Sequence, residues 1–273
     1  MAATFVVIPQ WQGSVSARAM RLADGADAIR GDLPASATRV VEVPVGAGEA
    51  LGTGVHRYSS LLRVAEHARE ELAAVAGQAV VIGGDCAVTL PAIERALATD
   101  ADTTVLWFDA HPDLNTAETS PSGAFGGMVL RALLGDGPEG LVPSTPLSPA
   151  RVVLCGVRDI DPGEEEYLQN AGITLLDVDQ LTDADALLAA LGDTSSVYLH
   201  IDLDVLDPAT IAGLDYPMPF GLSVESLTAL IAAVKGRASV LGATIAGFAP
   251  ASPADAADDL PSILRIIGAI TRG

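Results

Sequence analysis

Two short motifs in this chain place carboxylates and imidazoles at every second position. If the backbone stays extended, alternate residues point to one side, so each motif gathers its polar groups on one face. Carboxylates gathered in this way repel one another unless they take up protons or hold a cation. The members are Asp109, His111 and Asp113 in the first motif and His200, Asp202 and Asp204 in the second.

The donor types of the two motifs indicate which cation they would hold. Carboxylate oxygens with one or two imidazoles suit Mn²⁺ and, to a lesser degree, Zn²⁺, Co²⁺ or Fe²⁺. Two such ions can hold a water as hydroxide near neutral pH, which is the chemistry of a hydrolase. Each aspartate could instead merely cap a turn or helix. Because both motifs end a buried apolar run, we prefer the metal site.

A third candidate lies where another apolar run meets two glycines, Gly83 and Gly84, followed by Asp85 and Cys86. The glycines allow a sharp turn, and a helix is expected to begin near Asp85. Cys86 would then lie at a helix N-terminus, where the dipole favours thiolate. A lone cysteine is usually a packed residue, as we expect for Cys155, but the nearby motifs favour a ligand role for Cys86.

Elements that could position these motifs alternate along the chain, which predicts βα units around a mainly parallel sheet. Thr182 and Ser223 are expected to cap helices. Long loops cover 110–124, 135–149 and 203–222, and two of them follow predicted strands, where ligands bind in such sheets. The predicted strands are 4–8, 39–43, 79–82, 104–108, 151–154, 174–176, 196–201 and 243–247, and the clearest helices are 58–75, 87–98, 181–191, 224–234 and 260–270.

Composition narrows the class of protein. The 273 residues carry a formal charge of −20, which disfavours nucleic acid and anionic membranes as partners. A solubility adaptation is the preferred explanation of this charge. No apolar stretch reaches the roughly 20 residues that span a bilayer. The first residues contain no basic segment typical of a signal peptide. We expect a cytoplasmic protein with a single catalytic domain over residues 1–273, and its oligomeric state stays open.

Together the three motifs resemble the signatures of the ureohydrolase superfamily, which includes arginases and agmatinases. The resemblance implies a three-layer α/β/α fold with a mainly parallel eight-stranded sheet and a dinuclear Mn²⁺ centre. It implies that Asp109 and Asp202 bridge the metals. One metal would also take Asp113 and Cys86, and the other His111 and Asp204. The family's arginases carry histidine at position 86, so we expect the metal beside Cys86 to be held weakly or to be missing.

The arginase branch is the most similar, which implies a small guanidino amino acid as substrate. In that branch, Asn115 and Ser122 would hold the α-carboxylate, and Asp161 and Glu164 the α-amino group. Asp161 and Glu164 are also spaced to open a helix at Pro162, and this alternative stays open.

Three positions depart from the arginase pattern. Ala124 replaces an asparagine, Gly126 replaces the proton-shuttle histidine, and Gly247 replaces the glutamate that pairs with the guanidinium. The departures are similar to those of members that cleave Nω-hydroxy-L-arginine to hydroxyurea and L-ornithine in D-cycloserine biosynthesis. There a metal-bridging hydroxide would attack, with Asp113 and His200 as catalytic residues. The alternatives are an arginase, another guanidino-acid amidinohydrolase, or a degenerate member that only binds a guanidino ligand.

Overall fold

The computed structural model describes residues 3–272, and its centre is an eight-stranded sheet. Every neighbouring pair of strands is parallel, in the order β2-β1-β3-β8-β7-β4-β5-β6. The strands are β1 (Thr4–Ile8), β2 (Thr38–Val40), β3 (Ala79–Gly83), β4 (Thr104–Phe108), β5 (Val152–Cys155), β6 (Thr174–Leu176), β7 (Ser196–Asp202) and β8 (Ser239–Ala246).

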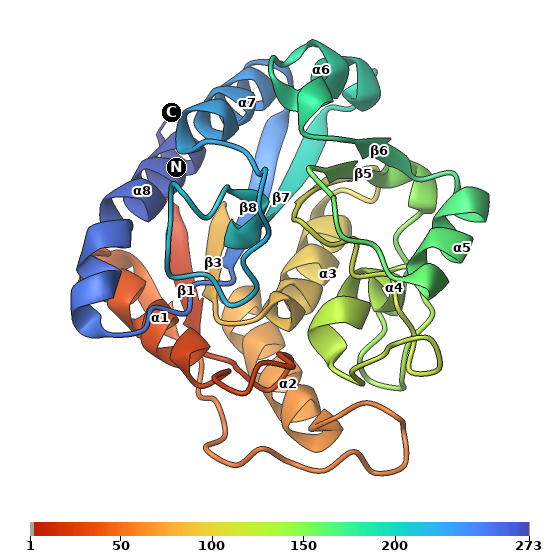
Figure 1. Ribbon diagram of the computed structural model, residues 1–273, viewed down its shortest axis with the longest axis vertical. Coiled ribbons are helices and arrows are strands. Elements are labelled where there is room, and N and C mark those ends of the chain that lie inside the picture. Colours follow the sequence, from red (N-terminus) through yellow and green to blue (C-terminus); the bar gives the residue numbers. More distant parts are fainter. Residues whose placement is uncertain (1–2, 273) are drawn as a thin grey trace.

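Helices cover both faces of the sheet and form a three-layer α/β/α arrangement, as expected (Figure 1). One core lies under α1, α6, α7 and α8, and the other under α2, α3 and α4. Along β3, Val80 and Ile82 pack into the first core and Val81 into the second, which explains the unbroken apolar run. The helices are α1 (Arg21–Gly31), α2 (Tyr58–Ala73), α3 (Thr89–Thr99), α4 (Val129–Leu133), α5 (Pro162–Ala171), α6 (Asp185–Leu191), α7 (Val224–Arg237) and α8 (Pro253–Thr271).

All predicted strands and helices are present. The strands at 4–8, 104–108 and 174–176 have the predicted ends, and the ends of the other elements are shifted. Ser223 caps α7 as expected, because its hydroxyl accepts the N–H of Ser226 at 3.0 Å. The expectation that Thr182 caps a helix is wrong. Its hydroxyl donates to the carbonyl of Asp179 at 3.0 Å, and α6 begins at Asp185. Cys155 is fully buried in the core, as expected.

Helix α1 was not predicted from the sequence. It is rich in small and acidic residues, and it contains Gly25, which lowers intrinsic helix stability. The structure explains this glycine, because a Cβ there would lie 2.0 Å from the carbonyl oxygen of Phe248. Close packing against the segment after β8 therefore overrides local propensity.

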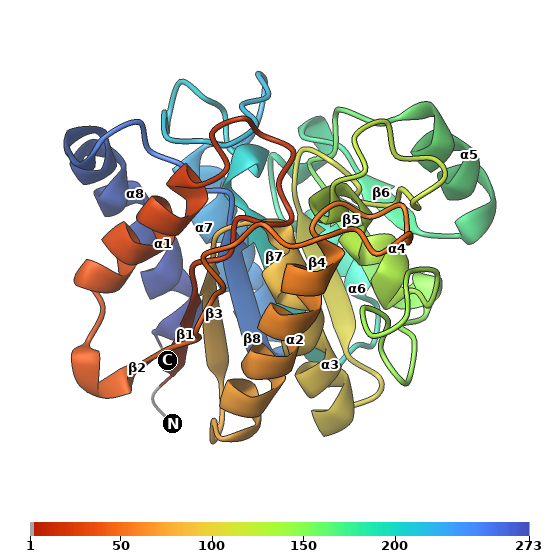
Figure 2. The same cartoon turned by 90° about the horizontal axis from the view of Figure 1, so that it is seen from below.

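The predicted chemistry lies at one end of the sheet. The four central strands, β3, β8, β7 and β4, are adjacent although the chain visits them in a different order. The segments that follow β1 and β7 lie together above the carboxyl ends of the strands (Figure 2). Within residues 3–272, no helix combines the length and apolar character needed to cross a membrane.

Candidate metal centre and substrate cavity

The first motif leaves β4 through a turn rather than an extended segment. The N–H of His111 donates to the carboxylate of Asp109 at 2.7 Å, and Asp113 has a left-handed φ of 53°. Aspartate tolerates this conformation better than most residues. The three side chains therefore converge on one cavity, as predicted, but the predicted extended path is wrong.

The second motif also ends in a turn, which orients its two aspartates. Asp202 ends β7, and one oxygen of its carboxylate accepts the N–H of Asp204 at 2.8 Å. The carboxylate of Asp204 in turn accepts the N–H of Ala110 at 2.9 Å. The second of these hydrogen bonds joins the ends of β4 and β7, which are paired in the sheet. The two motifs thus form one cluster.

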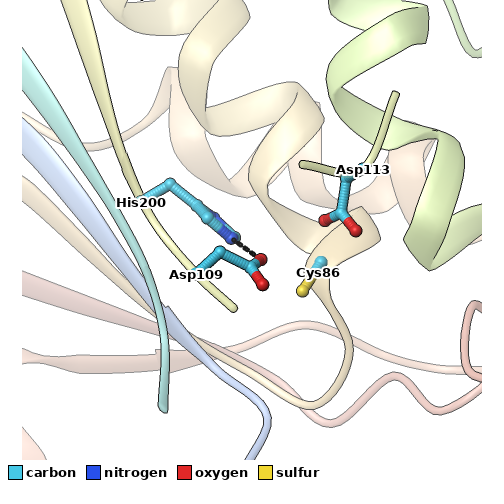
Figure 3. A group of neighbouring side chains, drawn as sticks. All are labelled: Cys86, Asp109, Asp113 and His200. Atoms are coloured by element: carbon cyan, nitrogen blue, oxygen red, sulfur yellow. Dashed lines mark ion pairs between the residues drawn. The ribbon is translucent and has the colours of Figure 1, made fainter. Parts of the chain in front are cut away.

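The donor atoms fit a pair of metal ions that share Asp109. Two groups have ligand atoms within 4.8 Å of one another. One contains Asp109, His111 and Asp204, and the other contains Cys86, Asp109, Asp113 and His200. Figure 3 shows the second group, with His200 directed toward Asp109. Asp202 belongs to neither group, although it contacts Cys86.

Unsatisfied polar atoms support this fit. Within residues 3–272, five buried side-chain polar atoms have no hydrogen-bond partner, and four of them belong to Asp109, Asp113 and His200. Such atoms are costly unless a ligand or ion satisfies them. These unsatisfied atoms gather around Asp109, the residue common to both groups, as expected for a metal centre.

The charges of the cluster are strongly coupled. Burial alone would raise the pKa of Asp109, but the imidazoles of His111 and His200 hold that pKa below its usual range. Burial opposes protonation of His111, yet hydrogen bonds to Asp109 and Asp204 raise its pKa to about 12. Burial and neighbouring carboxylates raise the pKa values of Asp113 and Asp202 well above the usual range. Without an ion, these carboxylates would take up protons, whereas a divalent ion would stabilise their charged forms.

His200 does not line the cavity. It is fully buried and stacks on Trp107 with ring centroids 3.7 Å apart. Its Nε2 lies 3.6 Å from Asp109, and neither ring nitrogen bonds to backbone. This geometry suits a residue that positions Asp109 from behind. Its catalytic role stays a prediction.

Cys86 begins a short 3₁₀ turn that leads into α3, and Asp85 caps this turn. The thiol donates to the carboxylate of Asp202 at 2.8 Å. Burial and the surrounding carboxylates raise its pKa well above the usual range. Among the protein groups alone, the expectation that the helix N-terminus favours thiolate is therefore wrong, because burial and nearby negative charge outweigh the dipole.

The residues predicted to hold the substrate line the same cavity, which has a volume of about 260 Å³. Asp161 is the N-cap of α5 and accepts a hydrogen bond from the side chain of Asn115 at 2.8 Å. Glu164 accepts the N–H groups of Leu114 and Asp161, both at 2.9 Å, and burial raises its pKa to about 7. The helix-opening alternative for this pair is therefore correct. It is compatible with substrate contact, since Ser122, Asn115, Asp161 and Glu164 all face the cavity.

The two glycine departures have local causes in the structure. A Cβ at Gly126 would lie 3.0 Å from the carbonyl oxygen of Gly13, which also accepts the N–H of Gly126. A Cβ at Gly247 would lie 2.2 Å from a carboxylate oxygen of Asp202. A side chain would therefore be tightly packed at position 126 and would collide with Asp202 at position 247.

Several cavity residues were not singled out in the sequence. Asp215 and Tyr216 lie in the long loop that follows β7, and Ser14 lies in the segment that follows β1. The Tyr216 ring packs edge-on against His111, with centroids 5.8 Å apart. The carboxylate of Asp159 lies 3.6 Å from Nε2 of His111. The length of the 203–222 loop predicted a ligand site there, but it did not indicate which of its residues face the cavity.

Comparison with known proteins gives consistent matches. Residues 15–260 match the model of the Arginase family. The chain is 38% identical to an arginase of Bacillus caldovelox over 201 residues, 67% of each chain. It is 34% identical to the N(omega)-hydroxy-L-arginine amidinohydrolase of Streptomyces lavendulae over 189 residues, 69% of this chain and 67% of that protein.

Solved structures agree on the fold. The arginase of Entamoeba histolytica in complex with L-ornithine superposes with a TM-score of 0.86 at 23% identity, covering 99% of this chain and 98% of that one. The proclavaminate amidino hydrolase of Streptomyces clavuligerus gives a TM-score of 0.74 at 19% identity, covering 99% and 92%. With a metal-binding cluster at the carboxyl ends of its central strands, this chain belongs to the arginase family of hydrolases that act on amidino carbon–nitrogen bonds.

Proposed function

We propose that this protein hydrolyses Nω-hydroxy-L-arginine to hydroxyurea and L-ornithine, as a step of D-cycloserine biosynthesis. The single observation that carries this proposal is the contrast within the cavity. Carboxylates and imidazoles converge on a metal-binding cluster, with Cys86 in place of one histidine. By contrast, positions 126 and 247, which carry the proton-shuttle histidine and the guanidinium-pairing glutamate in arginases, are glycines here. The similarity to a relative named for this substrate supports the proposal.

The chemical argument concerns basicity. Arginine stays protonated in protein sites, so its guanidinium is best bound by a carboxylate partner. Its hydrolysis also depends on a general acid–base group, which typically contributes about 10²–10⁴-fold to rate. An N-hydroxyl group lowers the basicity of a guanidine, so its neutral form is accessible and needs no carboxylate partner. A site with Gly126 and Gly247 therefore suits a hydroxyguanidine better than arginine.

The residues of the cluster have separate tasks in this scheme. When bound, a pair of Mn²⁺ ions would supply Lewis acidity and lower the pKa of water. The ions would be held by Cys86, Asp109, His111, Asp113, Asp202 and Asp204. Water adds to the guanidine carbon, and the bond from that carbon to the ornithine nitrogen breaks. Asp113 carries a proton from the water to the leaving amine. Its Oδ2 has no hydrogen-bond partner among residues 3–272.

The other end of the substrate is assigned to the loop after β4 and to the start of α5. Asn115 and Ser122 would bind the α-carboxylate. Asp161 is the better candidate for the α-amino group, because both oxygens of Glu164 already accept backbone N–H groups. An amino acid is thus a better substrate than its decarboxylated or deaminated analogue.

The test is to incubate Mn²⁺-loaded protein with L-arginine and with Nω-hydroxy-L-arginine and to identify the products. Hydroxyurea and ornithine from the hydroxylated substrate, with a kcat/KM at least tenfold above that for arginine, are expected. Urea from arginine at comparable rates would overturn the substrate assignment. Binding without any product would favour the degenerate, ligand-binding alternative.

A further inference from the structure

We propose that Asp215 is a specificity-determining residue whose carboxylate receives the N–H groups of the substrate's guanidino head. The inference rests on the proposed amidinohydrolase function and deepens it. It answers how a cavity without a side chain at position 247 still recognises a guanidino group.

The first step is that a side chain at Gly247 would be strained and would displace Asp202. The φ of Gly247 is +84°, a conformation that side-chain residues rarely adopt. A Cβ would lie 2.2 Å from one oxygen of Asp202 and 2.8 Å from the other. A carboxylate aimed at the guanidino head must therefore come from another segment.

The second step is that Asp215 lies beside Gly247. The N–H of Asp215 donates to the carbonyl of Gly247 at 3.0 Å, and Leu214 forms a bridge with Phe248. The N–H of Gly247 donates to the carbonyl of Gly84 at 2.8 Å. The loop after β7 is thus attached to the end of β8, and this attachment brings Asp215 to the cavity wall.

The third step concerns the carboxylate itself. Asp215 is half-buried, lines the cavity, and accepts a hydrogen bond of 2.6 Å from the hydroxyl of Ser14. Burial raises its pKa, and hydrogen bonds from Ser14 and Ser16 oppose that rise. No cationic side chain among residues 3–272 forms an ion pair with it. A partly desolvated carboxylate without a cation is less favourable than a paired one, which points to a cationic or donor-rich ligand.

The fourth step separates Asp215 from the metal site. Neither group of side chains that could hold an ion includes it. Ser14 is in turn fixed by Arg57, which donates to its carbonyl at 2.7 Å. Asp215 therefore has a held position on the cavity wall, outside the ligand set, where the N–H groups of a guanidine or hydroxyguanidine can reach it.

The test compares L-arginine with L-citrulline, which has the same shape but a neutral ureido head. Binding to the Mn²⁺-loaded protein is measured by calorimetry, with a urea assay to confirm that arginine stays intact. We expect the wild type to prefer arginine and Asp215→Asn to reduce that preference at least tenfold, with unchanged manganese content. In parallel, KM for Nω-hydroxy-L-arginine should rise more than kcat falls.

Asp207→Asn is the matched control, because Asp207 lies in the same loop and accepts the N–H of Phe220 but does not line the cavity. It should keep the preference for arginine. An unchanged preference in Asp215→Asn, or an equal loss of both ligands, would overturn the proposal. If the Asn variant does not fold, Asp215→Ser serves the same comparison. Since binding is measured without turnover, failure of the proposed reaction leaves this result interpretable.

Discussion

The thiol of Cys86 and the carboxylate of Asp202 are in direct contact, with the sulfur 2.8 Å from an oxygen. Cys86 begins the turn after β3, and Asp202 ends β7, with β8 between these two strands. The contact therefore spans the centre of the sheet. It makes position 86 part of the carboxylate cluster, with a soft donor where hard oxygen donors predominate.

Cys86→His should tighten the binding of Mn²⁺ at this side of the centre. Imidazole binds Mn²⁺ without the deprotonation that a buried thiol among carboxylates resists. After dialysis, we expect manganese content closer to two ions per chain in the variant than in the wild type. Cys86→Ser, which keeps the size but offers no imidazole, is the control and should not retain more metal. Equal manganese content in wild type and Cys86→His would contradict the expected asymmetry.

Asp113→Asn should remove most activity while leaving the fold intact. Asparagine tolerates the left-handed φ of 53°, so the backbone should not be strained. Loss of the proton carrier should lower kcat/KM by about 10²–10⁴-fold, measured on Nω-hydroxy-L-arginine. Asp136→Asn, at an exposed carboxylate, should remain fully active. An active Asp113→Asn enzyme would rule out the proposed proton path.

His200→Ala should affect stability as well as activity. The change leaves a space beside Trp107 and behind Asp109, for which we expect a loss of about 1–3 kcal/mol in unfolding free energy. kcat/KM should fall because Asp109 is no longer held. Thermal melting and steady-state kinetics check both effects, with His67→Ala as a control away from the cluster. If His200→Ala kept full kcat/KM, a catalytic role for this residue would have to be dropped.

Gly247→Ala should disrupt the metal cluster through Asp202. The added methyl group meets an oxygen of Asp202 at 2.2 Å, in addition to the strain of a positive φ. Gly172→Ala is a matched control, because its φ of +70° is similar and nothing lies within 4 Å of its Cβ. We expect about 1 kcal/mol of destabilisation in the control and a larger loss, with reduced manganese content, in Gly247→Ala. Equal effects of the two substitutions would show that strain alone matters.

Much of the fold was predictable from local sequence. Strands buried on both faces are recognised as unbroken apolar runs. Helices such as α2 and α7 are recognised by amphipathic periodicity or by their capping residues. The aspartates and histidines of the metal cluster were predictable because they lie at the ends of two buried apolar runs. Their backbone path was not. Asp109 and Asp202 each accept an N–H two residues later, and this local hydrogen bond turns the chain where extension was expected.

The donor types of the metal site and the alternation of strands and helices follow from local sequence, since both depend on neighbours along the chain. The folded structure was needed to show that His200 stands behind Asp109, that the thiol of Cys86 faces a carboxylate, and that Asp215 lies beside Gly247. The reason is the strand order. Because β8 inserts between β3 and β7, segments distant along the chain meet at one edge, and local periodicity contains no information about such meetings.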